Sequence, residues 1–375
     1  MMHIKIAHIL HCVGGVDVSL RLILENIDTD KFENIIIHGI KDSKKDFYDK
    51  NSKKIKSYKI SIIRNISVFK DLSAIINTYK ILKKEKPHII HAHSAKGGVI
   101  GRIAGFLLGI NVLYTPQAFS YLSTNNKIKR NAFLFIEKLL KLKNNYILAS
   151  SLSEKTRAIN EVGYKEENVI LFNNSINLIN CSKKITIEKT WPDEYICTVG
   201  RPSYQKNIEL MILVLYETRK SINIHLVIMG VGHHSDKLEN VKKLIKELNI
   251  GESVTLLDWT DRENIFSIIK NSKLYISTAR YEGLPYSVIE ALALSKSCVV
   301  SDCDGNRDLI QNDYNGYVIK NENVTEYAEK INSILMNEKL SGEFSKNALN
   351  SFNENYNIKN NISNLEDIYD EYSIK

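Results

Sequence analysis

The sequence predicts an α/β protein with two doubly wound domains, each built on a parallel β-sheet. Its 375 residues are about the length of two ordinary domains. Short runs rich in Ile and Val alternate with longer segments of helical periodicity, which is typical of parallel strands joined by crossover helices. This alternation occurs twice, in two series of similar length. A chain with 43% hydrophobic and 25% charged residues is globular, which excludes wholesale disorder and collagen-like repeats.

In the first half of the chain, strands are predicted at short apolar runs rich in β-branched residues. These runs are Ile4–Leu10, Ile35–His38, His88–His91, Val112–Tyr114, Tyr146–Ala149 and Val169–Phe172. Between them, apolar residues recur at three- and four-residue spacing, which predicts helices. The helices are expected near Val18–Asn26, Asp71–Lys84, Lys96–Leu108, Lys129–Leu142 and Ser153–Val162. We place this first domain at residues 1–178.

The second half repeats the pattern after a polar linker at Asn173–Asp193, which contains Trp191-Pro192 near its end. Strands are predicted at Tyr195–Val199, Ile224–Met229, Val254–Leu257, Leu274–Ser277, Cys298–Ser301 and Tyr317–Ile319. Helices are expected near Ile208–Lys220, Lys237–Leu248, Arg262–Asn271, Tyr286–Leu294 and Asn306–Gln311. We place the second domain at residues 190–352, and the last 50 or so residues predict helices only.

Cysteine usage and the N-terminus favour a cytoplasmic protein. The five cysteines are scattered and odd in number, with no C-x-x-C pair, so a disulfide framework is not expected. The segment up to Gly15 carries Lys5 and histidines in a short apolar run, which is typical of a first strand and not of a signal peptide. The uncharged stretch Ile103–Asn126 contains Gly, Asn and Pro, so we predict no membrane span there.

The net charge of +8 is distributed unevenly. Residues 1–180 contain 28 Lys and Arg against 15 acidic residues, whereas residues 181–375 contain 23 against 28. A basic surface suits nucleic acid, anionic lipid or phosphorylated substrates. Exposed lysines also serve solubility alone, so the charge by itself leaves these alternatives open.

The most informative segment is Ser277–Glu290, which joins a predicted strand to a predicted helix. Ligands of doubly wound sheets bind beyond the carboxyl ends of strands. The stretch Gly283–Pro285 gives backbone freedom and leads into the helix, whose N-terminal amides can bind an anion. Glu282 lies in the loop, and Glu290 lies among apolar residues, where a carboxylate needs donors such as sugar or ribose hydroxyls. Alternatively, both acids are structural.

Two further loops follow strands and carry suitable residues. Arg201 and Lys206 lie in the loop after Tyr195–Val199, and a guanidinium with an ammonium suits a diphosphate. Gly14 and Gly15 follow the first strand, where glycines let the backbone approach a phosphate. The dinucleotide and P-loop fingerprints are both absent, which argues against NAD and P-loop chemistry.

His91 and His93 form an H-x-H pair on one face of a predicted strand. A metal site would need a third ligand, and the sequence indicates none nearby, so no metal is predicted. Ser94 is expected to cap the helix that follows. No Ser-His-Asp order or nucleophile elbow is present.

These motifs together resemble the retaining glycosyltransferases of family 4. The resemblance rests on EGLPYSVIEALAL and VGRPSYQKN, with support from GGVDVSL, HAHSAKGGVIGRIAG, YTPQAFSYL and GNRDLI, and it covers nearly the whole chain. It implies the GT-B fold, with two Rossmann-like domains facing a cleft and a nucleotide-sugar donor. It also implies that a terminal helix, at about Asn355–Tyr372, completes the N-terminal, acceptor-binding domain.

The resemblance assigns roles to residues of this sequence. Arg201 and Lys206 are expected to bind the donor diphosphate, and Glu282 to face the transferred sugar. Glu290 is expected to hold the ribose hydroxyls. Contacts with the donor's sugar and phosphates are expected from the backbone at Gly14, Gly15, Gly283, Leu284 and Pro285, and Leu257 and Asp258 lie where such enzymes place the base.

The sequence departs from the family pattern at two places, one near the sugar and one near the linker. Gln117-Ala118 stands where the family usually has His-Gly, and Asn174-Ser175 stands where it often has Asn-Gly. We expect Gln117 and His93 near the sugar or acceptor. The implied mechanism retains the anomeric configuration by front-face attack, with Arg201 and Lys206 stabilising the leaving diphosphate. It needs no metal or other cofactor.

The expected function is transfer of a hexose or N-acetylhexosamine, from a UDP-sugar in preference to a GDP-sugar, in bacterial lipopolysaccharide or capsule biosynthesis. The acceptor would be a glycan or lipid-linked saccharide, and no nucleic acid is expected as a partner. A nucleotide-sugar epimerase of the same fold and a non-catalytic lipid-binding relative are the alternatives.

The segment Asn126–Asn145 predicts a basic amphipathic helix with one acid, Glu137. Such a helix can rest in the headgroup region of an anionic membrane. Lys127, Lys129 and Arg130 are the expected lipid contacts, which would make the protein peripheral on the inner face of the cytoplasmic membrane. Alternatively, the apolar stripe packs on the sheet and the lysines are solvated.

Overall fold

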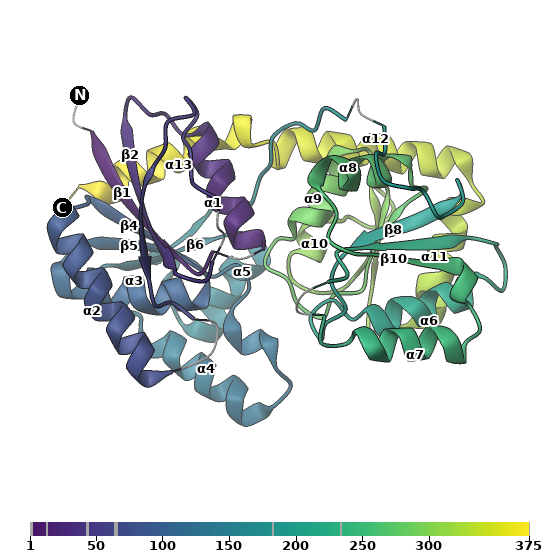
Figure 1. Cartoon of the computed structure of the whole chain (residues 1–375), viewed down its shortest axis with the longest axis horizontal. Coiled ribbons are helices and arrows are strands. Elements are labelled where there is room, and N and C mark those ends of the chain that lie inside the picture. The colour runs from purple at the N-terminus through teal and green to yellow at the C-terminus, as the bar shows by residue number, and fades with distance from the viewer. Residues whose placement is uncertain are drawn as a thin grey trace. The chain divides into compact units, whose positions relative to one another are not determined.

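The computed structural model divides the chain into two compact units. The first comprises Met1–Asn177 with Ile358–Lys375, and the second comprises Leu178–Asn357. The structure describes residues 3–12, 14–42, 45–63, 67–181, 184–232 and 235–374. Each unit is a parallel sheet covered by helices, which confirms the predicted α/β class (Figure 1).

The first unit contains a seven-stranded sheet of order β3-β2-β1-β4-β5-β6-β7. Its strands are β1 (Ile4–Leu10), β2 (Phe32–Gly39), β3 (Lys56–Ile60), β4 (Ile89–His93), β5 (Asn111–Thr115), β6 (Asn145–Ala149) and β7 (Val169–Leu171). The sequence patterns do not predict β3. It is an edge strand that pairs only with β2 and has a mixed polar sequence, so it lacks the apolar run of a central strand.

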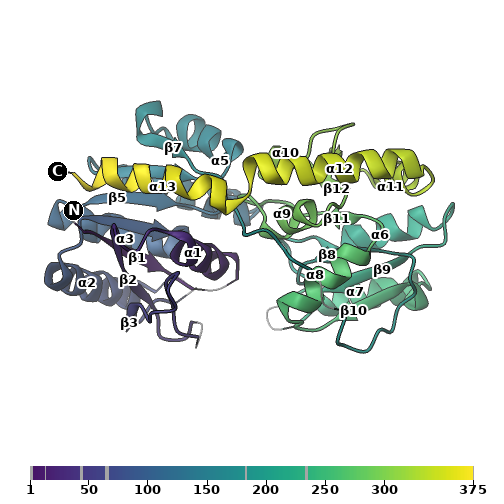
Figure 2. The ribbon, with the colours of Figure 1, turned by 90° about the horizontal axis from the view of Figure 1, so that it is seen from above.

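Helices cover both faces of this sheet. They are α1 (Gly15–Asn26), α2 (Val68–Glu85), α3 (Ser94–Leu108), α4 (Lys127–Leu139), α5 (Leu152–Arg157) and α13 (Ile358–Ser373). Alternate residues of each strand face opposite sides, so Ala7 and Ile9 join the core under α2 and α3 while Ile6 joins the core under α1 and α13 (Figure 2).

The terminal helix α13 belongs to the first unit although it is last in sequence. The Tyr369 hydroxyl lies 2.7 Å from His91 Nδ1, and the Asp28 amide donates to Glu366 Oε1 at 2.8 Å. Lys31 and Asp370 form an ion pair. The side chains of Leu365 and Tyr369 are fully buried against the sheet, so α13 is part of the core of this unit.

The second unit contains a six-stranded sheet of order β10-β9-β8-β11-β12-β13. Its strands are β8 (Tyr195–Val199), β9 (His225–Met229), β10 (Val254–Leu257), β11 (Tyr275–Ser277), β12 (Cys298–Ser301) and β13 (Gly316–Ile319). Its helices are α6 (Ile208–Thr218), α7 (Leu238–Glu247), α8 (Arg262–Asn271), α9 (Tyr286–Ala293), α10 (Asn306–Leu309), α11 (Val324–Leu335) and α12 (Glu338–Asn355). The chain runs outward from β8 in both directions, so the β8–β11 boundary is a topological switch point.

Candidate functional site

The loops after β8 and β11 meet at this switch point. The Thr278 hydroxyl donates to the Asn207 carbonyl at 2.9 Å, and the Arg280 amide donates to the Gln205 carbonyl at 2.8 Å. These bonds tie the loop that carries Lys206 to the loop that carries Glu282. The two loops therefore lie next to each other at the carboxyl ends of β8 and β11.

Lys206 and Glu282 form an ion pair, with Lys206 Nζ 2.7 Å from Glu282 Oε1. Gln205 Nε2 donates to the other oxygen at 3.3 Å. A Cβ at Gly200 would lie 3.2 Å from Lys206 Cγ, so the glycine leaves room for the lysine stem. Arg201, from the same loop, is half-buried. The site thus holds a half-buried cation in contact with a largely buried carboxylate.

The backbone at Gly305 packs closely against the loop that carries Glu282. Gly305 has a φ of +74°, and a Cβ there would lie 2.4 Å from the Gly283 carbonyl oxygen. Only glycine fits both the backbone angle and this close approach. Leu284 is buried. Pro285 is the N-cap of α9, which begins at Tyr286, where the sequence predicts the helix to start.

Glu290 lies on the second turn of α9 and is 5% exposed. Burial raises the pKa of its carboxyl group, and the neighbouring Arg262 guanidinium opposes that rise. Arg262 Nη2 donates to Glu290 Oε1 at 2.5 Å. Arg262 is not among the residues predicted from the sequence, because no sequence pattern indicates that two residues 28 positions apart on different helices will pair.

The loop after β10 carries the predicted base contacts. The Leu257 carbonyl accepts from the amides of Gly230 and Val231 at 3.1 and 2.9 Å, which ties this loop to the one after β9. Asp258 follows, and the Trp259 side chain is 88% exposed. Loops after β8, β10 and β11 thus lie at one edge of the same sheet, where predicted donor-binding residues are placed.

In the first unit, Gly14 and Gly15 lie where β1 gives way to α1. Gly14 has a φ of +62° and is the N-cap of α1, and a Cβ there would meet no atom within 4 Å. The positive φ at this position therefore favours glycine.

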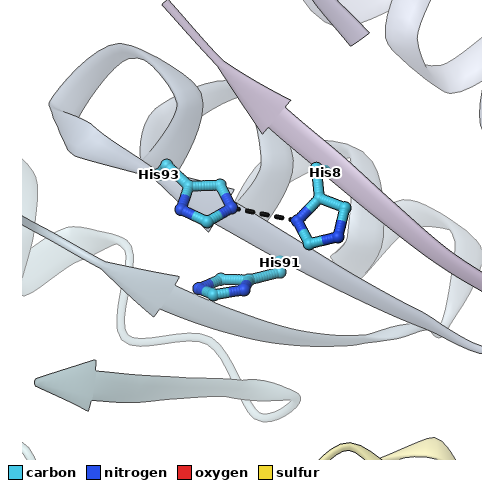
Figure 3. Close-up of side chains that lie close together, drawn as sticks. All are labelled: His8, His91 and His93. Carbon is cyan, nitrogen blue, oxygen red and sulfur yellow. Dashed lines mark hydrogen bonds between the residues drawn. The ribbon is translucent and has the colours of Figure 1, made fainter. Parts of the chain in front are cut away.

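His8, His91 and His93 form a buried cluster under α13 (Figure 3). The expectation that H-x-H lacks a third partner was wrong, because the parallel register of β1 and β4 places His8 opposite His91. His8 Nδ1 lies 3.1 Å from His93 Nε2, and His8 Nε2 lies 3.0 Å from Asn34 Oδ1. Among the described residues this is the one group of three potential metal ligands close together.

The geometry of the cluster favours a hydrogen-bonded chain over a metal centre. Both nitrogens of His91 have partners, Tyr369 and Thr115, and its ring is tilted by 33° to that of His93, with centroids 3.8 Å apart. Burial lowers all three pKa values, that of His8 to about 4, so the rings are neutral.

The residues expected near the sugar occupy unusual positions. His93 is fully buried and so is not open to a sugar here, and its Nδ1 has no hydrogen-bond partner among the described residues. Gln117 and Ala118 have φ values of +52° and +76°, in the left-handed region. Glu154 Oε1 accepts the Ala118 amide at 2.8 Å and holds this turn. The backbone thus keeps a conformation that favours glycine although alanine stands at position 118.

Helix α4 contains the predicted basic segment, and its two faces differ. Phe133 and Leu134 pack against the core, whereas Ile128, Phe135 and Leu139 are 81%, 62% and 60% exposed. Lys127, Lys129 and Arg130 are exposed. Glu137, the single acid, is buried against Arg102. No helix in the described part of the chain is long and apolar enough to cross a membrane.

Comparison with known proteins gives consistent matches over both units. The family model "Glycosyltransferase Family 4" matches residues 13–179, and "Glycosyl transferases group 1" matches residues 183–351. A UDP-Gal:alpha-D-GlcNAc-diphosphoundecaprenol alpha-1,3-galactosyltransferase of Escherichia coli is 27% identical, covering 98% of this chain and 96% of the relative. The capsular polysaccharide biosynthesis glycosyltransferase CapM of Staphylococcus aureus is 23% identical over 99% and 98%.

Two solved structures show the same fold. A sucrose-phosphate synthase of Thermosynechococcus elongatus superposes with a TM-score of 0.85 at 15% identity, covering 98% of this chain and 99% of that one. HepE of Anabaena, solved in complex with UDP, superposes with a TM-score of 0.77 at 15% identity, covering 99% and 100%.

Proposed function

Because this chain belongs to glycosyltransferase family 4 and has the GT-B fold, we propose that it transfers a hexose or N-acetylhexosamine from a nucleotide sugar, with retention of configuration. We further propose a UDP-sugar as donor and a lipid-diphosphate-linked saccharide as acceptor. The E. coli relative is named for such a donor and acceptor, and HepE was solved with UDP. The product would serve cell-surface polysaccharide biosynthesis.

The observation that carries the proposal is the contact of Lys206 with Glu282 beside the buried Glu290. A diphosphate entering beyond β8 would take Lys206 from Glu282, and the freed carboxylate would accept hydrogen bonds from the sugar hydroxyls. Arg201 lies in the same loop and would add a second cation. This exchange leaves Lys206 paired with a negative charge and gives the Glu282 carboxylate hydrogen-bond donors, which buried charged groups require.

The chemical step then needs only groups of this chain and the substrates. The bond between the anomeric carbon and the diphosphate oxygen breaks, the acceptor oxygen attacks from the same face, and its proton passes to the departing diphosphate. Lys206 and Arg201 stabilise the negative charge that develops on the leaving group. We therefore propose that no metal ion is required.

A thermal-shift screen with UDP-, GDP- and ADP-sugars tests the donor class, since a ligand that binds only the folded state raises Tm. We expect UDP and UDP-sugars to raise Tm and the others to have less effect. Lys206→Ala should reduce the shift, and Lys273→Ala, an exposed lysine of the same unit paired with Glu194, serves as its control. A larger shift with a GDP- or ADP-sugar would overturn the UDP assignment.

We also propose that α4 rests on the anionic inner face of the membrane. Its exposed apolar residues lie beside Lys127, Lys129 and Arg130, and each basic residue near such a surface contributes about 1 kcal/mol. The protein should bind liposomes rich in anionic lipid in a salt-sensitive manner.

Replacing these three residues with Glu should abolish liposome binding and leave hydrolysis of the donor unchanged. The matched control makes the same charge change at Lys80, Lys83 and Lys84, exposed residues of α2. If wild-type protein stays unbound at low salt, or if both triple variants lose binding equally, α4 is not the membrane contact.

A further inference from the structure

Arg262 is held at the start of α8 by local contacts. Asp261 is the N-cap of this helix, and its side chain accepts from the Asn264 amide at 2.9 Å. The Arg262 guanidinium carbon lies 5.0 Å from the centre of the Phe266 ring, one turn further along. Capping and ring contact together limit where the guanidinium can lie.

From this position Arg262 reaches a buried carboxylate on a neighbouring helix. Its side chain is 49% exposed, whereas that of Glu290 is 6% exposed and surrounded by the buried apolar residues of α9. Arg262 donates a hydrogen bond to Oε1 of Glu290. The described residues provide no hydrogen-bond partner for Oε2. One oxygen of this carboxylate is therefore occupied and the other is available.

We propose that Arg262 is a positioning residue, which fixes the Glu290 carboxylate so that Oε2 accepts hydrogen bonds from the ribose hydroxyls of the nucleotide. The proposal rests on the proposed nucleotide-sugar site, to which Glu290 belongs. A carboxylate on a flexible side chain loses rotamer freedom when it binds a ligand, and a fixed partner removes that cost in advance.

Charge supports the same role. Burial favours the protonated form of Glu290, and Arg262 is the largest of the opposing influences, ahead of Lys206. Only the ionised form offers both oxygens purely as acceptors. Arg262 also begins the helix that follows the loop of Asp258, so it connects the predicted base contact with the predicted ribose contact.

The test compares UDP with 2′,3′-dideoxy-UDP by calorimetry in wild type, Arg262→Gln, Arg262→Lys and Glu290→Gln. Wild type should prefer UDP by roughly 10- to 100-fold, the scale of a hydrogen bond to a charged group. Arg262→Gln should lower UDP affinity towards that of the dideoxy compound, whose own affinity should be unchanged. Arg262→Lys should restore part of the preference. Lys270→Ala, on the exposed surface of the same helix, should match wild type.

The outcomes separate the two levels of the argument. If wild type does not distinguish the two nucleotides, the assignment of Glu290 to ribose fails, and the inference fails with it. If Glu290→Gln abolishes the preference but Arg262→Gln keeps it, the inference about Arg262 alone is wrong. Equal loss of both affinities in Arg262→Gln would show a merely structural role. Should Arg262→Gln not fold, the same criteria apply to Arg262→Lys: its preference for UDP should be smaller than that of wild type, with the affinity for the dideoxy compound unchanged.

Discussion

Breaking the buried ion pair between Arg102 and Glu137 should strongly destabilise the first unit beneath α4. Arg102 is fully buried, and its Nη2 donates to Glu137 Oε2 at 2.8 Å. The Tyr114 hydroxyl donates to the other carboxylate oxygen at 3.1 Å, and the guanidinium lies 4.1 Å from the centre of the Tyr114 ring. Removing either charge leaves the other buried and unpaired, which costs about 3–5 kcal/mol.

For a unit of this size, each kcal/mol shifts Tm by about 2–4 °C, so Arg102→Met or Glu137→Leu should lower Tm by roughly 10 °C. Thermal unfolding followed by circular dichroism measures this, with Lys138→Met on the exposed side of α4 as the control. Replacing both partners together should recover much of the loss, because no unpaired charge remains. The reasoning fails if either single variant melts within about 2 °C of wild type, or if the double variant is as unstable as their sum.

Three further predictions concern the site and the histidine cluster. Arg201→Ala and Lys206→Ala should each lower turnover by at least about 100-fold, which is the scale of losing a hydrogen-bond donor to a developing charge. A chelator should leave wild-type turnover intact. Strong dependence of turnover on added Mg²⁺ or Mn²⁺ would contradict the metal-free mechanism. Glu282→Ala should reduce turnover more than UDP affinity, whereas Glu290→Ala should reduce both, and wild-type binding and turnover in both variants would exclude the assigned roles. Burial lowers the pKa of His8 to about 4, so the unfolded chain binds a proton at His8 at a higher pH than the folded protein does. The stability contributed by the neutral ring is therefore fully present above pH 6.5, and about 3 kcal/mol of it is lost as the pH falls from 6.5 towards 4. Denaturant unfolding at several pH values should show this loss, and His8→Asn should make it smaller; an identical pH dependence would count against a buried neutral His8.

Much of the fold follows from sequence because central parallel strands are apolar on both faces. Runs such as Ile35–His38 and Cys298–Ser301 lie inside strands of the structure. The edge strand β3, with the sequence KSYKI, has no such run and was missed. Edge strands are specified by the neighbour they pair with, and that neighbour is not apparent from local pattern.

The candidate site was predictable in its motifs and not in its pairings. Lys206 and Glu282 could be placed in loops after strands, and strand order then explains why they meet. The pairing of Arg262 with Glu290 depends on how α8 packs beside α9, and single-sequence patterns contain no signal for it. The same limit applies to Glu137, which local pattern placed as one acid on a basic helix and which the structure buries against a partner 35 residues away.

Real-time proton NMR of the reaction tests most directly whether the protein transfers a sugar from a nucleotide sugar with retention of configuration. The protein is incubated with a panel of UDP-hexoses and a chelator, with and without a lipid-diphosphate-linked saccharide. We predict that UDP is released, that the first sugar product has the α configuration of the donor, and that Lys206→Ala abolishes both signals. A β-configured first product would contradict retention, and a new nucleotide-sugar isomer without UDP release would show an epimerase instead of a transferase.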